Sequence, residues 1–160
     1  MRFSSIAIIF QSASIFATTL ASGGTDRSYG PSKNFDCEGR KLYGSDLEPF
    51  RQEGARRILN RQVQKINDYN ILRQLNWGYD RNSFSCVNGK PAAYYLHRLE
   101  GYTHSQPEGK WVNEIDYMLV LDGLGHTCTM MMKRFMRHHT TRAADVPIED
   151  SIFDLCSITS

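Results

Sequence analysis

The chain has 160 residues, of which 41% are hydrophobic and 22% are charged, and its formal net charge at pH 7 is +2. This length suits one domain with a modest core. The nearly even balance of charge excludes an argument for nucleic-acid binding from net charge, so any such role has to come from local basic patches.

Residues 1–21 predict a signal peptide. Arg2 supplies a positive charge, an apolar stretch follows, and small residues near Ala21 offer a cleavage site. The stretch is short and interrupted by polar residues, which makes a membrane anchor the less favoured alternative. No later apolar run has spanning length, so we expect a secreted mature protein without a membrane segment. Residues 22–34 are expected to form a flexible N-terminus before a domain at 35–160.

The first ordered elements are expected to be a short edge strand at 35–43 and then a helix. Ser45 and Glu48 have the spacing of a capping box, and apolar residues recur at near-helical spacing after them. These signals predict a helix at 46–64. The apolar positions within 63–75 either continue this helix or form a second short one.

Beyond residue 84 the sequence is typical of strands, with apolar or aromatic runs separated by turn residues such as Asn88-Gly89. The runs are 84–87, 92–99, 115–121, 128–135 and 152–158, and loops are expected at 101–109 and 137–147. The third and fourth runs predict a hairpin with its tip at 120–129. A helix followed by antiparallel strands predicts an α+β fold, with the helix packed on one face of a small sheet.

Four cysteines, Cys37, Cys86, Cys128 and Cys156, follow the predicted signal peptide. An even number in an oxidising route favours two disulfides over a metal site or a catalytic thiol. No pair has Cys-x-x-Cys spacing, so neither zinc nor another metal is expected, and no cofactor is implied. Spacing alone allows three pairings.

Several short motifs together resemble a known family. They are Phe35-Asp36-Cys37 after the leader, one helix, a strand led by Asn88-Gly89-Lys90-Pro91, a Tyr-rich hairpin and a late cysteine. The chain resembles the RNase-like secreted effectors of powdery mildew fungi, whose fold is similar to that of small fungal guanyl-specific ribonucleases. The resemblance covers nearly the whole mature chain and implies a Cys37–Cys156 bond, which leaves Cys86 to pair with Cys128.

The resemblance also implies a place for catalytic residues. Tyr95 and His97 match the Tyr and His that lie at the phosphate in the ribonucleases, and alternate residues on a strand share a face. Glu108 is a loose candidate for the catalytic Glu. At the position where the family has an Arg that stabilises the transition state, this chain has Tyr117. We therefore predict a ribonuclease scaffold that lacks a complete catalytic set.

A basic stretch near the end of the predicted hairpin gives candidate RNA-binding residues, namely Lys133, Arg134, Arg137 and Arg142. It is interpreted either as a phosphate-binding edge or as a solvated loop without a partner. The methionines at 130–132 either fill the core or contact a partner protein.

Three functional hypotheses follow. The favoured one is a secreted fungal effector that binds host RNA or a host protein without turnover, outside cells or in the host cytoplasm after uptake. The second is an active guanyl-preferring ribonuclease that cleaves RNA through a 2′,3′-cyclic phosphate. The third is a disulfide-stapled apoplastic toxin or interaction protein.

Overall fold

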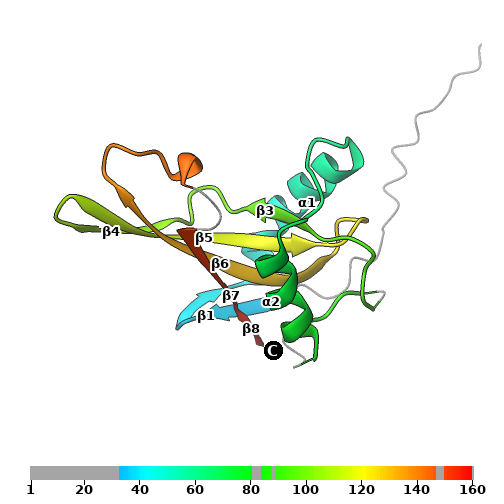
Figure 1. Cartoon of the computed structure of the whole chain (residues 1–160). Coiled ribbons are helices and arrows are strands. Elements are labelled where there is room, and N and C mark those ends of the chain that lie inside the picture. Colours follow the sequence, from blue (N-terminus) through cyan, green and yellow to red (C-terminus); the bar gives the residue numbers. More distant parts are fainter. Residues whose placement is uncertain (1–32, 81–83, 88, 147–149, 160) are drawn as a thin grey trace, which may run out of the picture.

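The computed structural model describes residues 33–80, 84–87, 89–146 and 150–159 (Figure 1). The predicted signal peptide, nearly all of the predicted flexible segment and Asn88 of the predicted turn lie outside the described residues. In chain order the elements are β1 (Asn34–Cys37), β2 (Arg40–Leu42), α1 (Gly44–Leu59), α2 (Tyr69–Asp80), β3 (Tyr95–Arg98), β4 (His104–Glu108), β5 (Trp111–Leu121), β6 (Thr127–His138), η1 (Ala143–Asp145), β7 (Ser151–Leu155) and β8 (Ser157–Thr159).

The described residues form two α-helices and two antiparallel sheets. The small sheet has the order β2-β1-β8, and the large sheet has the order β3-β5-β6-β7, with β4 paired to the remaining length of β5. The predicted α+β class is confirmed, with two helices in place of one. Figure 1 shows β4 and the adjoining ends of β5 and β6 extending away from both helices. We call this part of the sheet, residues 104–113 and 135–138, the arm.

Both predicted disulfides are present. Cys37–Cys156 joins β1 to the residue between β7 and β8, and Cys86–Cys128 ties the segment 84–87 to β6. The first bond links residues 119 positions apart. By the chain-entropy account, a loop of that length stabilises the folded state by about 5 kcal/mol. Bonds of this kind are typical of proteins that fold in an oxidising compartment.

Helix α1 begins and ends earlier than the predicted range 46–64. The predicted capping box is wrong, because the Ser45 hydroxyl donates to the carboxylate of the next residue and Glu48 accepts from a guanidinium one turn later. Instead, the Gly44 amide donates to Asn34 Oδ1 at 2.9 Å, and the amides of Asp46 and Leu47 donate to the Tyr43 carbonyl. Beyond the last turn, Arg61 has a φ of 55°, in the left-handed region, so the helical path cannot continue.

Of the two alternatives for residues 63–75, the separate helix is correct. Helix α2 begins at Tyr69, and the Asp68 carboxylate before it accepts the backbone amide of Ile71 at 3.0 Å. Aspartate at this position satisfies an amide that has no partner within the helix, which favours a new helix start. Neither helix of the described chain is both long and apolar enough to cross a bilayer.

Two predictions in the middle of the chain were wrong. Residues 84–87, predicted as a strand, have irregular backbone that is held by the disulfide and by a bond from the Ser85 amide to the Cys128 carbonyl. Residues 101–109, predicted as a loop, contain β4, whose five residues are all exposed. Strand β4 exists because it forms a hairpin with β5 across the turn at residues 109–110, a pairing that the polar sequence of β4 does not reveal.

Two predictions near the C-terminus also need correction. The predicted loop 137–147 begins with the end of β6 and contains the 3₁₀ turn η1. The predicted strand 152–158 is two strands, β7 and β8, which belong to different sheets. The chain changes sheets at Cys156, whose amide donates to the Met130 carbonyl at 3.0 Å.

The large sheet has a hydrophobic core on each face. Because side chains alternate along a strand, the odd-numbered residues 117–121 of β5 pack against α1 and the small sheet, and the even-numbered ones against α2. Met130 and Met132 belong to the first core and Met131 to the second, and each is at most 1% exposed. The methionine run therefore fills the core on both faces.

Candidate functional site

Tyr95 and His97 lie on β3 and face α1. Tyr95 packs against the core, and His97 is 8% exposed. A Cβ added to Gly54 of α1 would lie 3.1 Å from the imidazole Cγ of His97, which shows how closely the helix covers the ring. Burial lowers the pKa of His97, and the charge of Arg57 lowers it further, while two nearby carboxylates oppose the shift. The imidazole is thus favoured as the neutral form and lies beneath a helix.

Glu108 lies far from His97. Both residues pair with β5, His97 opposite Leu119 and Glu108 opposite Trp111 at the end of the arm. Eight residues of extended strand separate those two positions, which corresponds to about 26 Å. A general acid and a general base must both lie within hydrogen-bond reach of one phosphodiester, so these two residues cannot act on the same bond.

Tyr117 occupies the position where the resemblance expects an arginine. Its side chain is 3% exposed in the core, and the guanidinium of Arg40 lies 4.8 Å from its ring centroid. Because residue 117 points into the core between the large sheet and α1, an arginine there would not face solvent. The charged residues of β5, Glu114 and Asp116, lie instead on the other face of the strand.

The predicted basic stretch is divided between the two faces of the sheet. Arg134 is on the face of the small sheet, where it forms ion pairs with Glu38 and Asp154. Lys133 and Arg137 are on the opposite face. Arg142 follows β6, and its 89% exposed side chain lies 3.9 Å from a carboxylate one turn later. The four residues therefore do not form one continuous basic edge.

A cluster of five charged side chains and one threonine lies on the same face of the large sheet as the even-numbered residues of β5, beside the part of the sheet that α2 covers. We call it the charged face, and it comprises Arg98, Thr103, Glu114, Asp116, Lys133 and Arg137. The two carboxylates are each 5% exposed, which is rare for acidic residues unless they are paired.

Both carboxylates of the charged face are bonded to an arginine. Asp116 Oδ1 accepts from Arg98 Nη2 at 2.7 Å and from Thr103 Oγ1 at 3.0 Å. Glu114 Oε2 accepts from Arg137 Nε. A buried carboxylate that loses its partner costs about 3 to 5 kcal/mol, so these pairs stabilise the sheet. They also balance the charges of the two arginines within the fold.

Lys133 differs from the two arginines. It lies directly opposite Asp116 on β5 and Phe153 on β7, and its Nζ is 4.7 Å from the ring centroid of Phe135. Within the residues that the structure describes, the Lys133 amine has no hydrogen-bond or ion-pair partner. Burial lowers the pKa of Lys133, and the Asp116 charge opposes this. The charged face thus has three cations and two carboxylates, with Lys133 as the excess positive charge.

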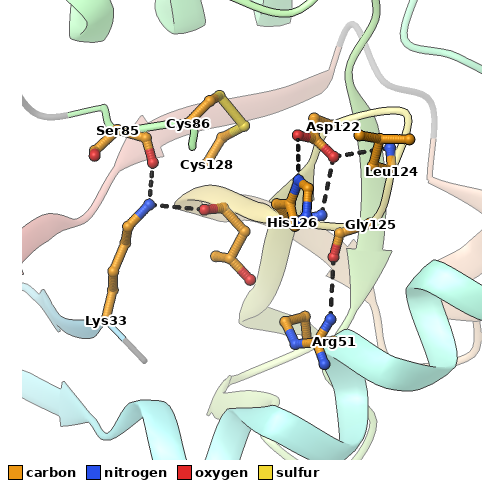
Figure 2. Close-up of polar contacts among 10 residues, drawn as sticks. Lys33, Arg51, Ser85, Cys86, Asp122, Leu124, Gly125, His126 and Cys128 are labelled. Atoms are coloured by element: carbon orange, nitrogen blue, oxygen red, sulfur yellow. Dashed lines mark hydrogen bonds and ion pairs between the residues drawn. A yellow bond between two sulfur atoms is a disulfide. The ribbon is translucent and has the colours of Figure 1, made fainter. Parts of the chain in front are cut away.

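A second polar cluster lies at the turn between β5 and β6, shown in Figure 2. Asp122 Oδ1 accepts the backbone amides of Leu124 at 2.8 Å and His126 at 2.9 Å, and its Oδ2 lies 2.9 Å from His126 Nδ1. One buried carboxylate therefore organises the whole turn. This arrangement explains the position of His126 through the folding of the turn.

The same turn is fixed to α1. The Gly125 carbonyl accepts from Arg51 Nη1 at 3.4 Å (Figure 2), and a Cβ at Gly125 would lie 2.2 Å from the Cβ of Ala55. On the other side, Lys33 Nζ donates to the carbonyls of Ser85 and Thr127. These contacts fix the turn to α1 on one side and to the segment 84–87 on the other.

Comparison with known proteins gives no relative from which a function could be inferred. No family model matches the chain, and no curated protein or solved structure is significantly similar to it. Among the described residues, no three His, Cys, Asp or Glu side chains come together as a metal site would require.

Sequence reasoning missed Arg98, Glu114 and Asp116. The available signal was the alternation of β5, which places both acids on the same face as Met118. Acidic residues on the apolar side of a strand predict buried partners of opposite charge.

Proposed function

We propose that this protein is a secreted effector that binds RNA through the charged face and does not cleave it. The observation that supports this is the environment of Lys133. Its amine is half-buried, forms no ion pair with a described carboxylate, and lies near Arg98, whose side chain is 44% exposed. A phosphodiester carries one negative charge, which matches the excess charge of the cluster. Recognition of RNA needs such a cation, whereas it does not need a general base.

Binding without turnover is favoured by the distance between the candidate catalytic groups. His97 is covered by α1, and Glu108 is at the far end of the arm. The two carboxylates of the charged face are occupied by Arg98 and Arg137. A secreted chain of this kind fits the two disulfides, which form in oxidising compartments.

The test measures the salt dependence of binding to a single-stranded oligoribonucleotide by fluorescence anisotropy. Lys133→Ala is compared with Lys65→Ala, which removes the same charge from an exposed position outside the charged face. For single strands, the slope of log affinity against log salt changes by about 0.7 for each phosphate contact. We expect Lys133→Ala to lose about that much slope and Lys65→Ala to keep the slope of the unmodified protein.

The same samples distinguish the rival functions. Intact oligonucleotide after long incubation is expected, and cyclic-phosphate products that disappear in His97→Ala would instead support the active ribonuclease. An absence of RNA affinity even at low salt would favour the toxin or interaction protein and reject the proposal.

A further inference from the structure

A small cavity lies between α2 and the outer edge of β7. Its volume is about 330 Å³, and it is lined by Arg73, Gln74, Trp77 and Asp154. Ligand pockets start at about 300 Å³, so this cavity is large enough for one planar ring system. It is separate from the charged face: Asp154 follows Phe153, which lies directly opposite Lys133, but the Asp154 carboxylate pairs with Arg134 on the other face of the sheet.

The three helical residues of the cavity share one face of α2. Positions 73 and 77 are one turn apart, and position 74 is three residues before 77, so their side chains are neighbours. The inner face of the same helix is fixed by Ile71 and Leu75, which are buried in the core between α2 and the large sheet. Helix α2 thus presents a cation, an amide and an aromatic ring outward on a rigid support.

Trp77 and Arg73 each offer a contact that a nucleotide can use. The Trp77 side chain is 51% exposed, and an exposed indole provides a face on which a base can stack. Arg73 is exposed, and none of the described carboxylates pairs with it, so its guanidinium is available for a phosphate. An arginine and a tryptophan on one wall favour an anionic aromatic ligand over a neutral apolar one.

Asp154 sets the hydrogen-bonding preference. Its Oδ2 is held by Arg134 Nη2, which orients the carboxylate. An ionised carboxylate accepts hydrogen bonds and cannot donate them. It therefore suits the exocyclic amino groups of guanine, adenine and cytosine, whereas uracil has carbonyl oxygens in place of an amino group and can donate only its ring N3–H.

We propose that this cavity binds one unpaired, amino-bearing nucleobase of single-stranded RNA, with Trp77 as the stacking platform and Asp154 as the acceptor of the amino group. The choice of RNA as the source of the base rests on the proposed function of the charged face. The cavity would add a contact to the base, whereas Lys133 contacts the backbone.

The test is calorimetric titration of the disulfide-bonded protein with the four ribonucleoside monophosphates and with ribose 5-phosphate. We expect measurable binding of GMP, AMP and CMP, and weaker binding of UMP and of ribose 5-phosphate. Trp77→Ala is expected to weaken the binding of AMP by about 5- to 150-fold, the range for the loss of one stacked base. Trp111→Ala is the control, because that indole is 50% exposed on the arm, and no change is expected.

A second pair of variants tests the role of the carboxylate. Asp154→Asn can donate a hydrogen bond, so it is expected to reduce the preference for CMP over UMP. Glu38→Gln removes the other carboxylate that pairs with Arg134 and should leave the preference unchanged. Equal binding of all four nucleotides and ribose 5-phosphate, or equal effects of the two tryptophan variants, would overturn the inference.

The two proposals fail in different ways. If RNA binds in a manner that depends on Lys133 while no mononucleotide binds, the cavity is rejected and the proposed function stands. If mononucleotides bind as expected while an oligoribonucleotide does not, the cavity stands and RNA as its ligand is rejected.

Discussion

Replacement of Gly125 by alanine tests the contact between the β5–β6 turn and α1. Two effects add at this position. Gly125 has a φ of +82°, and a side chain in the left-handed region costs about 1 to 2 kcal/mol. The added Cβ would also lie 2.2 Å from the Cβ and 2.8 Å from the Cα of Ala55, whereas carbon atoms in contact are about 3.5 to 4.0 Å apart.

The magnitude follows from the sum of strain and overlap. The turn would have to move away from the backbone of α1 by about 1 Å, and overpacking of this kind costs about 1 to 3 kcal/mol. Together with the strain, we expect Gly125→Ala to lower the free energy of unfolding by about 2 to 5 kcal/mol. A domain of this size has about 5 to 15 kcal/mol in total, so the loss is readily measured.

Two other glycines separate the two effects. Gly109 has a φ of +64° but no heavy atom of the described structure within 4 Å of its added Cβ, so Gly109→Ala should show the strain without the overlap. Gly123, in the same turn as Gly125, has neither a left-handed φ nor a described atom within 4 Å, so Gly123→Ala should be nearly neutral.

Equilibrium urea unfolding with the disulfides intact provides the assay, because it reports the free energy of unfolding directly. If Gly125→Ala and Gly109→Ala cost the same, the turn does not contact α1 as described. If all three variants were equally stable, the left-handed conformation of both glycines would be refuted as well.

Two further predictions concern the cysteines and His97. Replacing Cys37 and Cys156 together by alanine should lower the free energy of unfolding by about 5 kcal/mol, and replacing Cys86 and Cys128 by about 4 kcal/mol, because the second bond closes a shorter loop. Urea unfolding of the two double variants checks this, and a larger loss from the shorter loop would contradict the entropic account. Because burial lowers the pKa of His97 in the folded state, the unfolded chain binds the extra proton first as the pH falls, so stability should decrease below about pH 6.5. Thermal unfolding at pH ~7 and ~5 should show a smaller decrease in His97→Gln than in the unmodified protein, and identical decreases would mean that His97 is solvated.

The elements that sequence could predict are those with local signals. Helix α1 and the β5–β6 hairpin follow from apolar periodicity and from glycine-rich turns, and both are present with shifted ends. Strand β4 could not be predicted, because none of its residues is buried and its hydrogen bonds go to a partner beyond a turn. The length of β5 depends on β4 in turn, since its first residues pair with β4 on one side and β6 on the other.

The candidate site is likewise only partly predictable from the sequence. Alternation correctly implies that Tyr95 and His97 share a face, but it does not say which face a helix covers. That depends on where α1 packs, and α1 packs on their side. The sequence allows either one long helix or a separate helix α2. It therefore does not show that α2 covers Met118 and leaves Asp116 uncovered. The charged face is therefore a product of tertiary packing.

The division of charge between the two faces of β6 bears on what the protein can bind. Had the cations Lys133, Arg134 and Arg137 formed one edge, a general affinity for polyanions would follow from their number. Instead, Arg134 and Arg137 are paired with carboxylates, and the excess charge is concentrated at Lys133. Binding should then depend strongly on one side chain and less on salt than a basic edge would, since fewer phosphates are neutralised. A binding surface of this kind needs further contacts for affinity, and the proposed base-binding cavity at Trp77 would supply one.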